Sequence, residues 1–371
     1  MRIPLVDLTW QQREIADEVR EGFDRLMESG QFVLGEEVEE FEAEYADFCG
    51  VEHCVGVANG TDALELGLRA LDIGQGDEVI LPANTFVASA LAVVRSGATP
   101  VLVDCAPSGS GMDTREVADR MGARTRAVMA VDLFGELANQ NEIEALAEES
   151  GIALVEDAAQ AQGARREGRA AGAFGALAGT SFYPGKNLGA YGDAGAVTTR
   201  SPELAGRLRR LRNYGSERKY EHPEIGFNSR LDALQAVVLR AKLRRLDSWN
   251  DARRRAARYY DEALGDVAGV ELPPGGRDAS HVWHIYAVRV SSRDRVLEEL
   301  QAAGVGVGIH YPTPIHLLGG FAFLGHRGGE FPRAESAAAA MISLPLFPGI
   351  REAQQERVVE LLAAAVAGKG S

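Results

Sequence analysis

Apolar residues in the N-terminal part of the chain recur at the spacing of amphipathic helices. Between residues 11 and 29, Ile15, Val19, Phe23 and Leu26 stand three or four positions apart among charged residues. A second stretch of this kind spans residues 36–48. Residues three and four apart lie on one face of a helix. We therefore expect two helices before the first strand.

From residue 54 onward the pattern changes to short apolar runs that alternate with helical stretches. The expected strands are 54–58, 79–81, 100–103, 127–131, 152–155, 177–183 and 194–198, and the expected helices include 61–71, 85–96 and 142–150. Short buried strands that alternate with helices are typical of a mainly parallel sheet with helices on both faces. The predicted fold class is therefore α/β, with ligands bound where strands lead into helices.

The second half of the chain predicts a long helix and then a smaller unit. The helix is expected to begin after Ser229, which forms a capping-box pattern with Asp232, and to continue through Trp249. Downstream, we expect a loop rich in proline and glycine at 272–278, a strand at 284–290, a helix at 293–303 and a helical tail. These features predict a large domain at 1–248 and a small α+β domain at 249–371.

Composition excludes several classes of function. Hydrophobic residues make up 46% and charged residues 25% of the chain, as in ordinary globular proteins. The net charge of −15 argues against nucleic acid or an anionic membrane as the main partner. Three scattered cysteines form no disulfide framework, and the sequence shows no signal peptide or membrane-spanning run. We expect a soluble, cytoplasmic protein.

The stretch from Gly179 to Gly192 contains the first candidate for chemistry. Its strand-like part ends at Pro184-Gly185 and presents Lys186 among glycines, which let another molecule approach the backbone. A lysine amine is a nucleophile only when deprotonated, and apolar surroundings lower its pKa. The aromatic residues expected to provide these surroundings are Phe182, Tyr183 and Tyr191.

The pattern around Lys186 has two other interpretations. A lysine in a surface loop would produce the same local pattern. A phosphate-binding P-loop fits less well, because Gly179 and Gly185 enclose five residues where that motif needs four, and Asn187 stands where it needs serine or threonine.

A second candidate site lies where the strand at 54–58 leads into the helix at 61–71. Thr61 or Asp62 is expected to cap this helix, so that backbone N–H groups at Gly60, Thr61 and Asp62 face outward. Together with the helix dipole they would bind an anion, best a phosphate. An ordinary capped helix shows the same pattern, so this signal alone is weak.

A third candidate is the pair Glu156 and Asp157, which ends a core strand and precedes small residues. Such a carboxylate is a metal ligand, a general base or the partner of a cationic ring nitrogen, and metal is least supported without clustered His or Cys. A lysine, an aspartate and a phosphate cradle at one sheet edge are what pyridoxal phosphate requires. The lysine forms its Schiff base, and the acid keeps the pyridine nitrogen protonated.

Seven motifs in order then make the sequence similar to a known family, the DegT/StrS-type sugar-nucleotide aminotransferases, which are fold type I pyridoxal phosphate enzymes. The motifs are Asn59-Gly-Thr-Asp-Ala-Leu, Pro82-Ala-Asn-Thr-Phe-Val-Ala, Glu156-Asp-Ala-Ala-Gln, Ser181-Phe-Tyr-Pro-Gly-Lys-Asn, Arg212-Asn-Tyr-Gly-Ser, Gly226-Phe-Asn-Ser-Arg-Leu-Asp and His310-Tyr-Pro-Thr-Pro-Ile-His-Leu. The resemblance covers nearly the whole chain.

The resemblance implies a role for each matching residue. Lys186 would be the Schiff-base lysine, Asp157 the partner of the pyridine nitrogen, and Phe86 the residue stacked on the ring. The remaining implied contacts are Gln160 at the other ring face or the ring hydroxyl, Thr61, Ser181 and the Asp62 backbone at the phosphate, and Tyr214, His310 and Tyr311 on the sugar side. Asn228 would reach the phosphate of a neighbouring subunit, which implies an obligate homodimer with shared sites.

The resemblance also implies the reaction. Glutamate would donate an amino group, leaving 2-oxoglutarate and pyridoxamine phosphate (PMP), and a nucleotide-diphosphate keto-deoxysugar, by resemblance dTDP-linked, would then receive it. The segment 214–222 and the loop 310–314 most resemble enzymes that aminate C3, with C4 as the alternative. A non-catalytic regulatory protein that binds the cofactor is the alternative from another class; the acidic chain without a basic DNA-binding module argues against it.

Some features depart from the family or carry no assigned function. Gln162 stands where many relatives have histidine, which leaves details of the substrate pocket open. Related dehydratases replace the Schiff-base lysine by histidine, whereas Lys186 is retained here. Five of the seven histidines lie between His281 and His326, but their spacing is not that of a zinc site, so no metal is expected. The basic run 207–212 is assigned no function.

Overall fold

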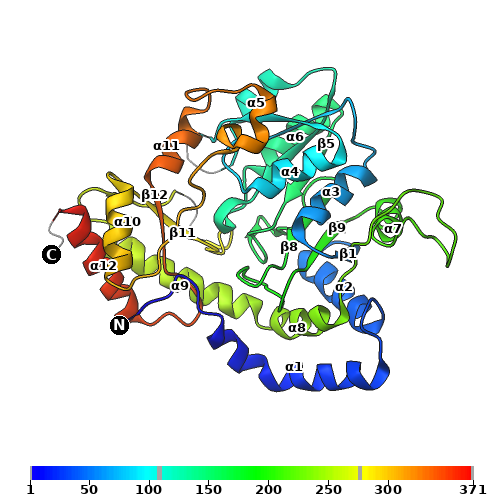
Figure 1. The fold of residues 1–371 in the computed structure, drawn as a ribbon, viewed down its shortest axis with the longest axis horizontal. Helices are drawn as coiled ribbons and strands as arrows, with labels where there is room; N and C mark the ends of the chain where they lie inside the picture. Colours follow the sequence, from blue (N-terminus) through cyan, green and yellow to red (C-terminus); the bar gives the residue numbers. More distant parts are fainter. Residues whose placement is uncertain (1, 107–110, 275–277, 369–371) are drawn as a thin grey trace.

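The computed structural model describes residues 2–106, 111–274 and 278–368. Its centre is a seven-stranded sheet in the order β1-β9-β8-β5-β4-β2-β3 (Figure 1). The strands are β1 (His53–Val57), β2 (Glu78–Pro82), β3 (Thr99–Val103), β4 (Thr125–Val131), β5 (Ala153–Asp157), β8 (Leu177–Ser181) and β9 (Gly195–Thr199). A separate two-stranded hairpin pairs β6 (Arg165–Arg166) with β7 (Arg169–Ala170).

Five neighbouring strands of this sheet, from β8 to β3, run parallel, and β9 is antiparallel to both β8 and β1. Side chains alternate between the two faces, so Val79 and Leu81 pack in one apolar cluster and Ile80 in another. One face is covered by α3 (Gly60–Ala70), α4 (Val87–Ser96) and α7 (Pro202–Leu211). The other is covered by α2 (Glu36–Cys49), α5 (Thr114–Arg120), α6 (Gln140–Ser150) and α8 (Ala233–Leu243).

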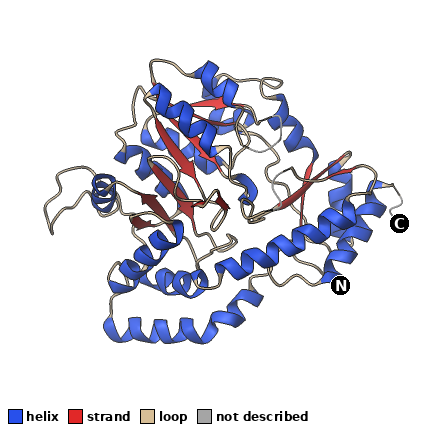
Figure 2. Ribbon diagram, turned by 180° about the vertical axis from the view of Figure 1, so that it is seen from behind, coloured by secondary structure: helices blue, strands red, loops and turns tan. Residues whose placement is uncertain are grey.

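A smaller three-stranded sheet forms the core of the C-terminal part (Figure 2). Its antiparallel strands are β10 (Val270–Glu271), β11 (Tyr286–Val290) and β12 (Met341–Leu344), and α9 (Leu246–Leu264), α10 (Arg293–Ala302), α11 (Pro332–Ala340) and α12 (Glu352–Val366) pack around them. Short 3-10 turns occur at Leu133–Gly135, Ile315–Leu317 and Gly319–Leu324. No helix within the described residues is both long and apolar enough to cross a lipid bilayer.

The N-terminal segment packs against the small C-terminal sheet and then against helix α8 beside the large sheet. Ile3 is buried in the apolar cluster of the small sheet. The Ile3 N–H donates to the Gly304 carbonyl, and the Ile3 carbonyl accepts from the Gly306 N–H. The chain then enters α1 (Thr9–Ser29), which packs on α8. Both N-terminal helices are present where the apolar spacing predicts them.

The prediction of one long helix from Ser229 was wrong. The helix begins at Ala233 and is interrupted at residues 244–245, which separate α8 from α9. Ser229 forms no capping box, because its hydroxyl donates to Asp62 and accepts from the Ala58 N–H. Leu243 and Leu246 on either side of the break are both buried, so the apolar period continues across it and conceals the interruption.

The predicted domain boundary between residues 248 and 249 falls within α9 and stays a prediction. Leu246 at the start of this helix packs in the cluster beneath the large sheet, whereas Tyr260 and Leu264 pack in the cluster of the small sheet. Figure 1 shows α9 running from beside α8 toward the small sheet. One continuous helix therefore connects the two parts.

Candidate active site

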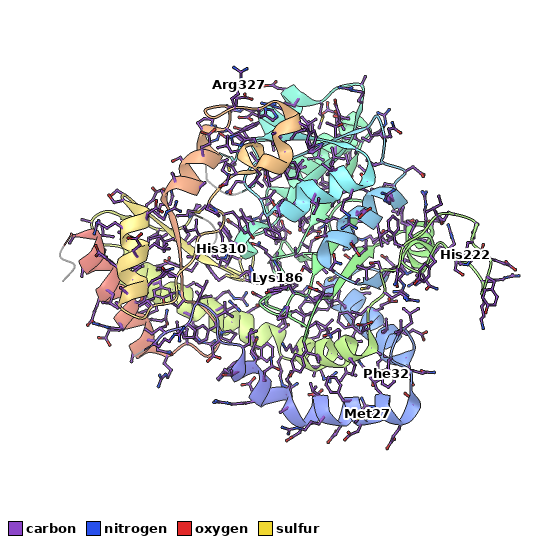
Figure 3. All side chains as sticks on the ribbon, in the orientation of Figure 1. Met27, Phe32, Lys186, His222, His310 and Arg327 are labelled. Atoms are coloured by element: carbon purple, nitrogen blue, oxygen red, sulfur yellow. The ribbon has the colours of Figure 1, made fainter. Side chains whose placement is uncertain are left out.

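A cavity of about 530 Å³ lies where the carboxyl ends of β5 and β8 meet the N-terminal ends of α3 and α4 and the small sheet. Most of the predicted site residues line it: Gly60, Thr61, Phe86, Asp157, Gln160, Ser181, Lys186, His310 and Tyr311. Figure 3 shows Lys186 and His310 at the centre of the molecule, between its two parts. The cavity is thus at the sheet edge where an α/β fold is expected to bind ligands.

Lys186 lies on the connection between β8 and β9, which turns back along the same edge of the sheet. The backbone N–H of Lys186 donates to the Tyr183 carbonyl at 2.8 Å. Burial lowers the pKa of the Lys186 amine to about 8, and the nearby Asp157 carboxylate partly opposes this shift. Lys186 is therefore a cavity lysine and not a surface loop lysine, and about one-tenth of its amine is unprotonated at pH 7.

The aromatic surroundings predicted for Lys186 are only partly present. Tyr183 lines the cavity. Phe182 is fully buried on the other side of the loop, where it packs edge-on against Phe41 and Tyr45. The ring of Tyr191 faces the Lys242 ammonium, whose nitrogen lies 5.3 Å from the ring centre. Desolvation of the lysine thus comes from the whole cavity and not from three aromatic rings.

Asp157 ends β5 with its carboxylate directed to the cavity side of the sheet. Oδ2 accepts a hydrogen bond from the Ser89 hydroxyl at 2.7 Å, and Oδ1 accepts from the Ala159 N–H at 3.2 Å. Burial raises the pKa of Asp157, whereas these hydrogen bonds and the Lys186 charge lower it. Ser89 was not predicted; its only signal in the sequence is a hydroxyl on the buried face of an apolar helix.

Glu156 points to the opposite face of the sheet, because successive strand residues alternate. Its carboxyl oxygens accept hydrogen bonds from the N–H groups of Gly172 and Phe174, each at 3.0 Å. Burial and the neighbouring Asp132 carboxylate raise the pKa of Glu156 well above its usual range. Of the two adjacent acids, only Asp157 is available to a ligand in the cavity.

The N-terminus of α3 opens into the cavity, but the predicted cap was wrong. The cap is Asn59, whose side-chain oxygen accepts from the Asp62 N–H at 2.8 Å. This bond engages the Asp62 backbone, which was expected to face outward, and leaves Gly60 and Thr61 in the first turn, where helix N–H groups lack intrahelical partners. A Cβ on Gly60 would lie 2.5 Å from the Cβ of Ser181. Glycine therefore permits the helix end and Ser181 to meet.

Gln160, Tyr311 and Phe86 form a connected group at the cavity. Gln160 Nε2 donates to the Tyr311 hydroxyl at 2.9 Å, and its Oε1 accepts from the Phe134 N–H at 2.7 Å. The rings of Phe86 and Tyr311 are 5.2 Å apart. Phe86 is half-exposed and immediately precedes α4, so its ring face is accessible to a planar ligand.

Tyr214, Asn228 and Gln162, which were also singled out from the sequence, do not line this cavity. Tyr214 is half-exposed, and the guanidinium of Arg230 lies 5.2 Å from its ring centre. Asn228 and Arg230 line a second hollow, which shares Asp193 with the cavity. Gln162 is fully buried behind β8, where Nε2 donates to the Ser181 carbonyl at 2.8 Å. The departure at position 162 therefore makes no direct contact with the cavity.

The basic run at 207–212 is held largely by carboxylates. Arg207 and Arg210 pair with Glu224, and Arg212 is buried beside Glu42. The described residues include no group of three or more His, Cys, Asp or Glu side chains that could hold a metal ion.

Sequence reasoning missed several cavity residues. Leu5 and Val6 line it from the N-terminal segment, and His284 lines it from just before β11. They lie far from Lys186 in the sequence and carry no motif of their own. Their position depends on the contact between the small sheet and the large one.

Comparisons with known proteins identify the family of the chain. The model of the DegT/DnrJ/EryC1/StrS aminotransferase family matches residues 13–363. A relative from Streptomyces venezuelae, named dTDP-3-amino-3,4,6-trideoxy-alpha-D-glucose transaminase, is 46% identical over 97% of this chain and 95% of its own length.

Solved structures lead to the same family. S. venezuelae DesV, in complex with a ketimine intermediate, superposes with a TM-score of 0.95 at 46% identity, covering 98% of both chains. NtdA from Bacillus subtilis, with bound cofactor PMP, superposes with a TM-score of 0.89 at 28% identity, covering 98% of this chain and 83% of its own.

These matches confirm the predicted family, the fold type I α/β architecture and the pyridoxal phosphate cofactor. They also confirm the prediction that the chain is an aminotransferase enzyme. The roles of individual residues stay predictions, supported by the cavity described above. The chain belongs to the DegT/DnrJ/EryC1/StrS aminotransferase family of pyridoxal-phosphate-dependent enzymes.

Proposed function

We propose that this protein transfers the amino group of glutamate to C3 of a dTDP-linked keto-deoxysugar, as a homodimer. The observation that carries the proposal is the meeting of Lys186, Asp157 and the α3 N-terminus in one cavity. The substrate is proposed from the name of the S. venezuelae relative, which is 46% identical along nearly its whole length.

The cavity residues fit pyridoxal phosphate. Asp157 is a desolvated carboxylate whose raised pKa reflects burial without full charge compensation, so a cationic ring nitrogen would satisfy it. The close approach of Gly60 and Ser181 leaves backbone N–H groups and a hydroxyl for a phosphate. Phe86 and Gln160 would hold the ring between them.

When bound, the cofactor supplies an electron sink for the carbon that loses its proton. The Asp157 carboxylate would keep a proton on the ring nitrogen, and Ser89 and the Ala159 N–H hold that carboxylate in place. The Lys186 amine, with its pKa lowered to about 8, would take the proton from the donor Cα at Nζ and return it to the neighbouring carbon.

The proposed homodimer explains why Asn228 and Tyr214 lie outside the cavity of their own chain. The segment around them extends from the body of the molecule, as the position of His222 shows in Figure 3. It exposes large apolar side chains, including Tyr220 and Ile225, and Phe32 and Val33 are exposed beside the second hollow. Such surface is typical of an interface between subunits. Asn228 would then reach the phosphate in the partner's site.

The reaction is tested by incubating the purified enzyme with glutamate and either 3-keto or 4-keto dTDP-deoxysugars. The expected product carries nitrogen at C3, identified by NMR. Amination at C4 instead would replace the proposed position by its alternative. Glutamate alone should convert the cofactor's visible absorption band into that of the amine form, and Lys186→Ala should lack the original band. A protein that holds the cofactor but does not respond to glutamate would contradict the proposal.

A further inference from the structure

Asn187 directly follows Lys186 in the sequence and has no role in the function proposed above. Lys186 lines the cavity, whereas Asn187 does not line it and is only 1% exposed. A buried amide needs hydrogen-bond partners, because leaving it unpaired costs free energy. The partners of Asn187 bear on the placement of Lys186, since the two residues share a peptide bond.

The Asn187 amide contacts two elements that come later in the chain. Its Nδ2 donates to Asn250 Oδ1 on α9 and to the Val282 carbonyl before β11, both at 2.9 Å. Its Oδ1 lies 3.2 Å from Nδ1 of His284, which lines the cavity. Both hydrogens of this amide and its oxygen are therefore engaged.

Backbone carbonyls determine how the two amides are turned. Asn250 Nδ2 donates to the Gln162 carbonyl at 2.9 Å, so Asn250 Oδ1 is the acceptor for Asn187. The Val282 carbonyl only accepts, so Asn187 must direct its Nδ2 toward it. A flipped Asn187 amide would direct its oxygen at two acceptors. One orientation of this side chain is thus strongly favoured.

The partners of Asn187 are themselves held in place. The Val282 N–H donates to the Gly135 carbonyl at 2.8 Å. A Cβ on Gly163 would lie 2.6 Å from Asn250 Nδ2, so glycine allows that amide its close approach. Asn187, Asn250 and Val282 are each at most 1% exposed. Side chains fixed by packing and hydrogen bonds in this way hold a neighbouring functional group in a defined position.

We propose that Asn187 is a positioning residue for Lys186. Its amide holds the peptide that bears the lysine against α9 and the segment before β11, and this fixes where the Lys186 amine lies in the cavity. Two further hydrogen bonds of the loop run elsewhere, from the Lys186 N–H to the Tyr183 carbonyl and from Lys242 on α8 to the Gly189 carbonyl. The inference rests on the proposed role of Lys186 as the residue that bonds to the cofactor.

The variant Asn187→Asp tests this role. It keeps the size of the side chain but turns a donor into an acceptor, which opposes Asn250 Oδ1 and the Val282 carbonyl. The full-length protein, freed of cofactor, is mixed with saturating pyridoxal phosphate. The lysine amine then adds to the aldehyde and water leaves. Borohydride reduction at intervals, followed by peptide mass spectrometry, measures the rate constant of this bond formation at Lys186.

This rate constant should fall about tenfold to hundredfold in Asn187→Asp, because the amine is displaced from its productive position. Loss of folded protein would lower the final amount of modified Lys186 but not the rate constant. Asn187→Ala removes the amide without adding a charge, and it should slow the reaction by about tenfold even where the aspartate variant does not fold. A wild-type rate constant in Asn187→Ala would overturn the proposal.

Gln355→Glu is the matched control. Gln355 is also a buried amide, 4% exposed, and its Nε2 donates to the Ala256 carbonyl at 2.8 Å, but it does not line the cavity. This variant should lower the unfolding temperature and keep the wild-type rate constant. Slowing equal to that of Asn187→Asp would overturn the positioning role. Modification of the wild type at a lysine other than Lys186 would instead refute the proposed role of Lys186, and this inference with it.

Discussion

The Ser89 hydroxyl helps to hold the Asp157 carboxylate in place at the cavity. Ser89 donates to Oδ2 at 2.7 Å and is itself 2.7 Å from the Thr85 hydroxyl, so two residues of the α4 start support the carboxylate. Hydrogen bonds to a carboxylate favour its charged form. In its proposed role, Asp157 needs the charged form in order to hold a cationic ring nitrogen.

Replacing Ser89 by alanine should weaken this support. Loss of the hydrogen bond raises the pKa of Asp157, so the acidic limb of the kcat/KM profile should move to higher pH, by up to about one unit. Kinetics across pH 5 to 8 provide the measurement. Ser96→Ala is a matched control on the same helix, because the Ser96 hydroxyl donates only to the Val93 carbonyl. Equal profiles for both variants would contradict this role of Ser89.

At the level of single residues, the sequence predicted the reacting groups better than their supports. Lys186 and Asp157 belong to motifs in which residue type and spacing carry chemical information. Ser89, Asn187 and Asn250 act through hydrogen bonds across the fold, and their partners are up to 97 residues away in the sequence. No local pattern specifies such contacts.

Among the elements, α2, β1 and α7 are joined by a buried ion pair. Glu42 accepts from the Gly56 N–H at 2.8 Å and pairs with Arg212, which also donates to the Gly56 carbonyl at 2.8 Å. Both side chains are less than one-tenth exposed. A basic run read from sequence alone does not reveal that its last arginine is buried.

Replacement of Arg212 by methionine should therefore leave the buried Glu42 with only the more distant, half-exposed Arg209 as a cation, 4.0 Å away. The expected loss in the free energy of unfolding is about 3–5 kcal/mol, measured by urea denaturation at fixed protein concentration. Arg209→Met, at a half-exposed position on the same helix, should change it by less than about 0.5 kcal/mol. Similar losses in the two variants would show that the Glu42–Arg212 ion pair does not account for the loss of stability.

The helices and strands were predicted well where a regular pattern of apolar residues stops at residues that clearly end an element. Strands β2 to β5 follow from short apolar runs between helices. The α3 cap and the break between α8 and α9 could not be predicted, because Asn59, Thr61 and Asp62 are all good caps and no proline or glycine marks residues 244–245. Burial by tertiary contacts decides such cases.

Helix α8 also supports the loop that carries Lys186. Gln235 accepts from the Tyr191 N–H at 2.8 Å, and the buried Lys242 ammonium donates to the Gly189 carbonyl at 2.6 Å. Burial lowers the pKa of Lys242 from 10.5 to about 8. At a pH between these two pKa values, Lys242 is therefore protonated in the unfolded chain but largely unprotonated in the folded protein.

This difference predicts a pH dependence of stability. Between pH 8 and 10.5 the unfolded state holds more protons at position 242, so wild-type stability should rise with pH relative to Lys242→Met, by at most about 3 kcal/mol. Below pH 8 the difference should be constant. Parallel thermal unfolding curves of the two proteins measure it. A difference that does not change above pH 8 would mean that Lys242 titrates normally in the fold.

For the whole molecule, the proposed homodimer predicts that two inactive variants restore activity to each other when they form mixed dimers. Lys186→Ala and Asn228→Ala should each be nearly inactive. Refolded together in equal amounts, they should regain about a quarter of wild-type activity, because half of the dimers are mixed and one site in each mixed dimer has both native residues. Activity measured before and after joint refolding tests this.

A mixture no more active than the sum of its components would mean that Asn228 serves its own chain. A wild-type sample taken through the same refolding provides the control for recovered protein. Light scattering on the mixture confirms that dimers have formed before the assay is read.

The antiparallel pairing of β8 with β9 has a consequence for how such enzymes diversify. The segment that bears Lys186 is anchored at both ends in the central sheet. The walls that would face a sugar come from elsewhere: the chain's first residues, the segment before β11 and the stretch around His310. Evolution can therefore exchange the parts that select a substrate while the bond-making machinery keeps its place.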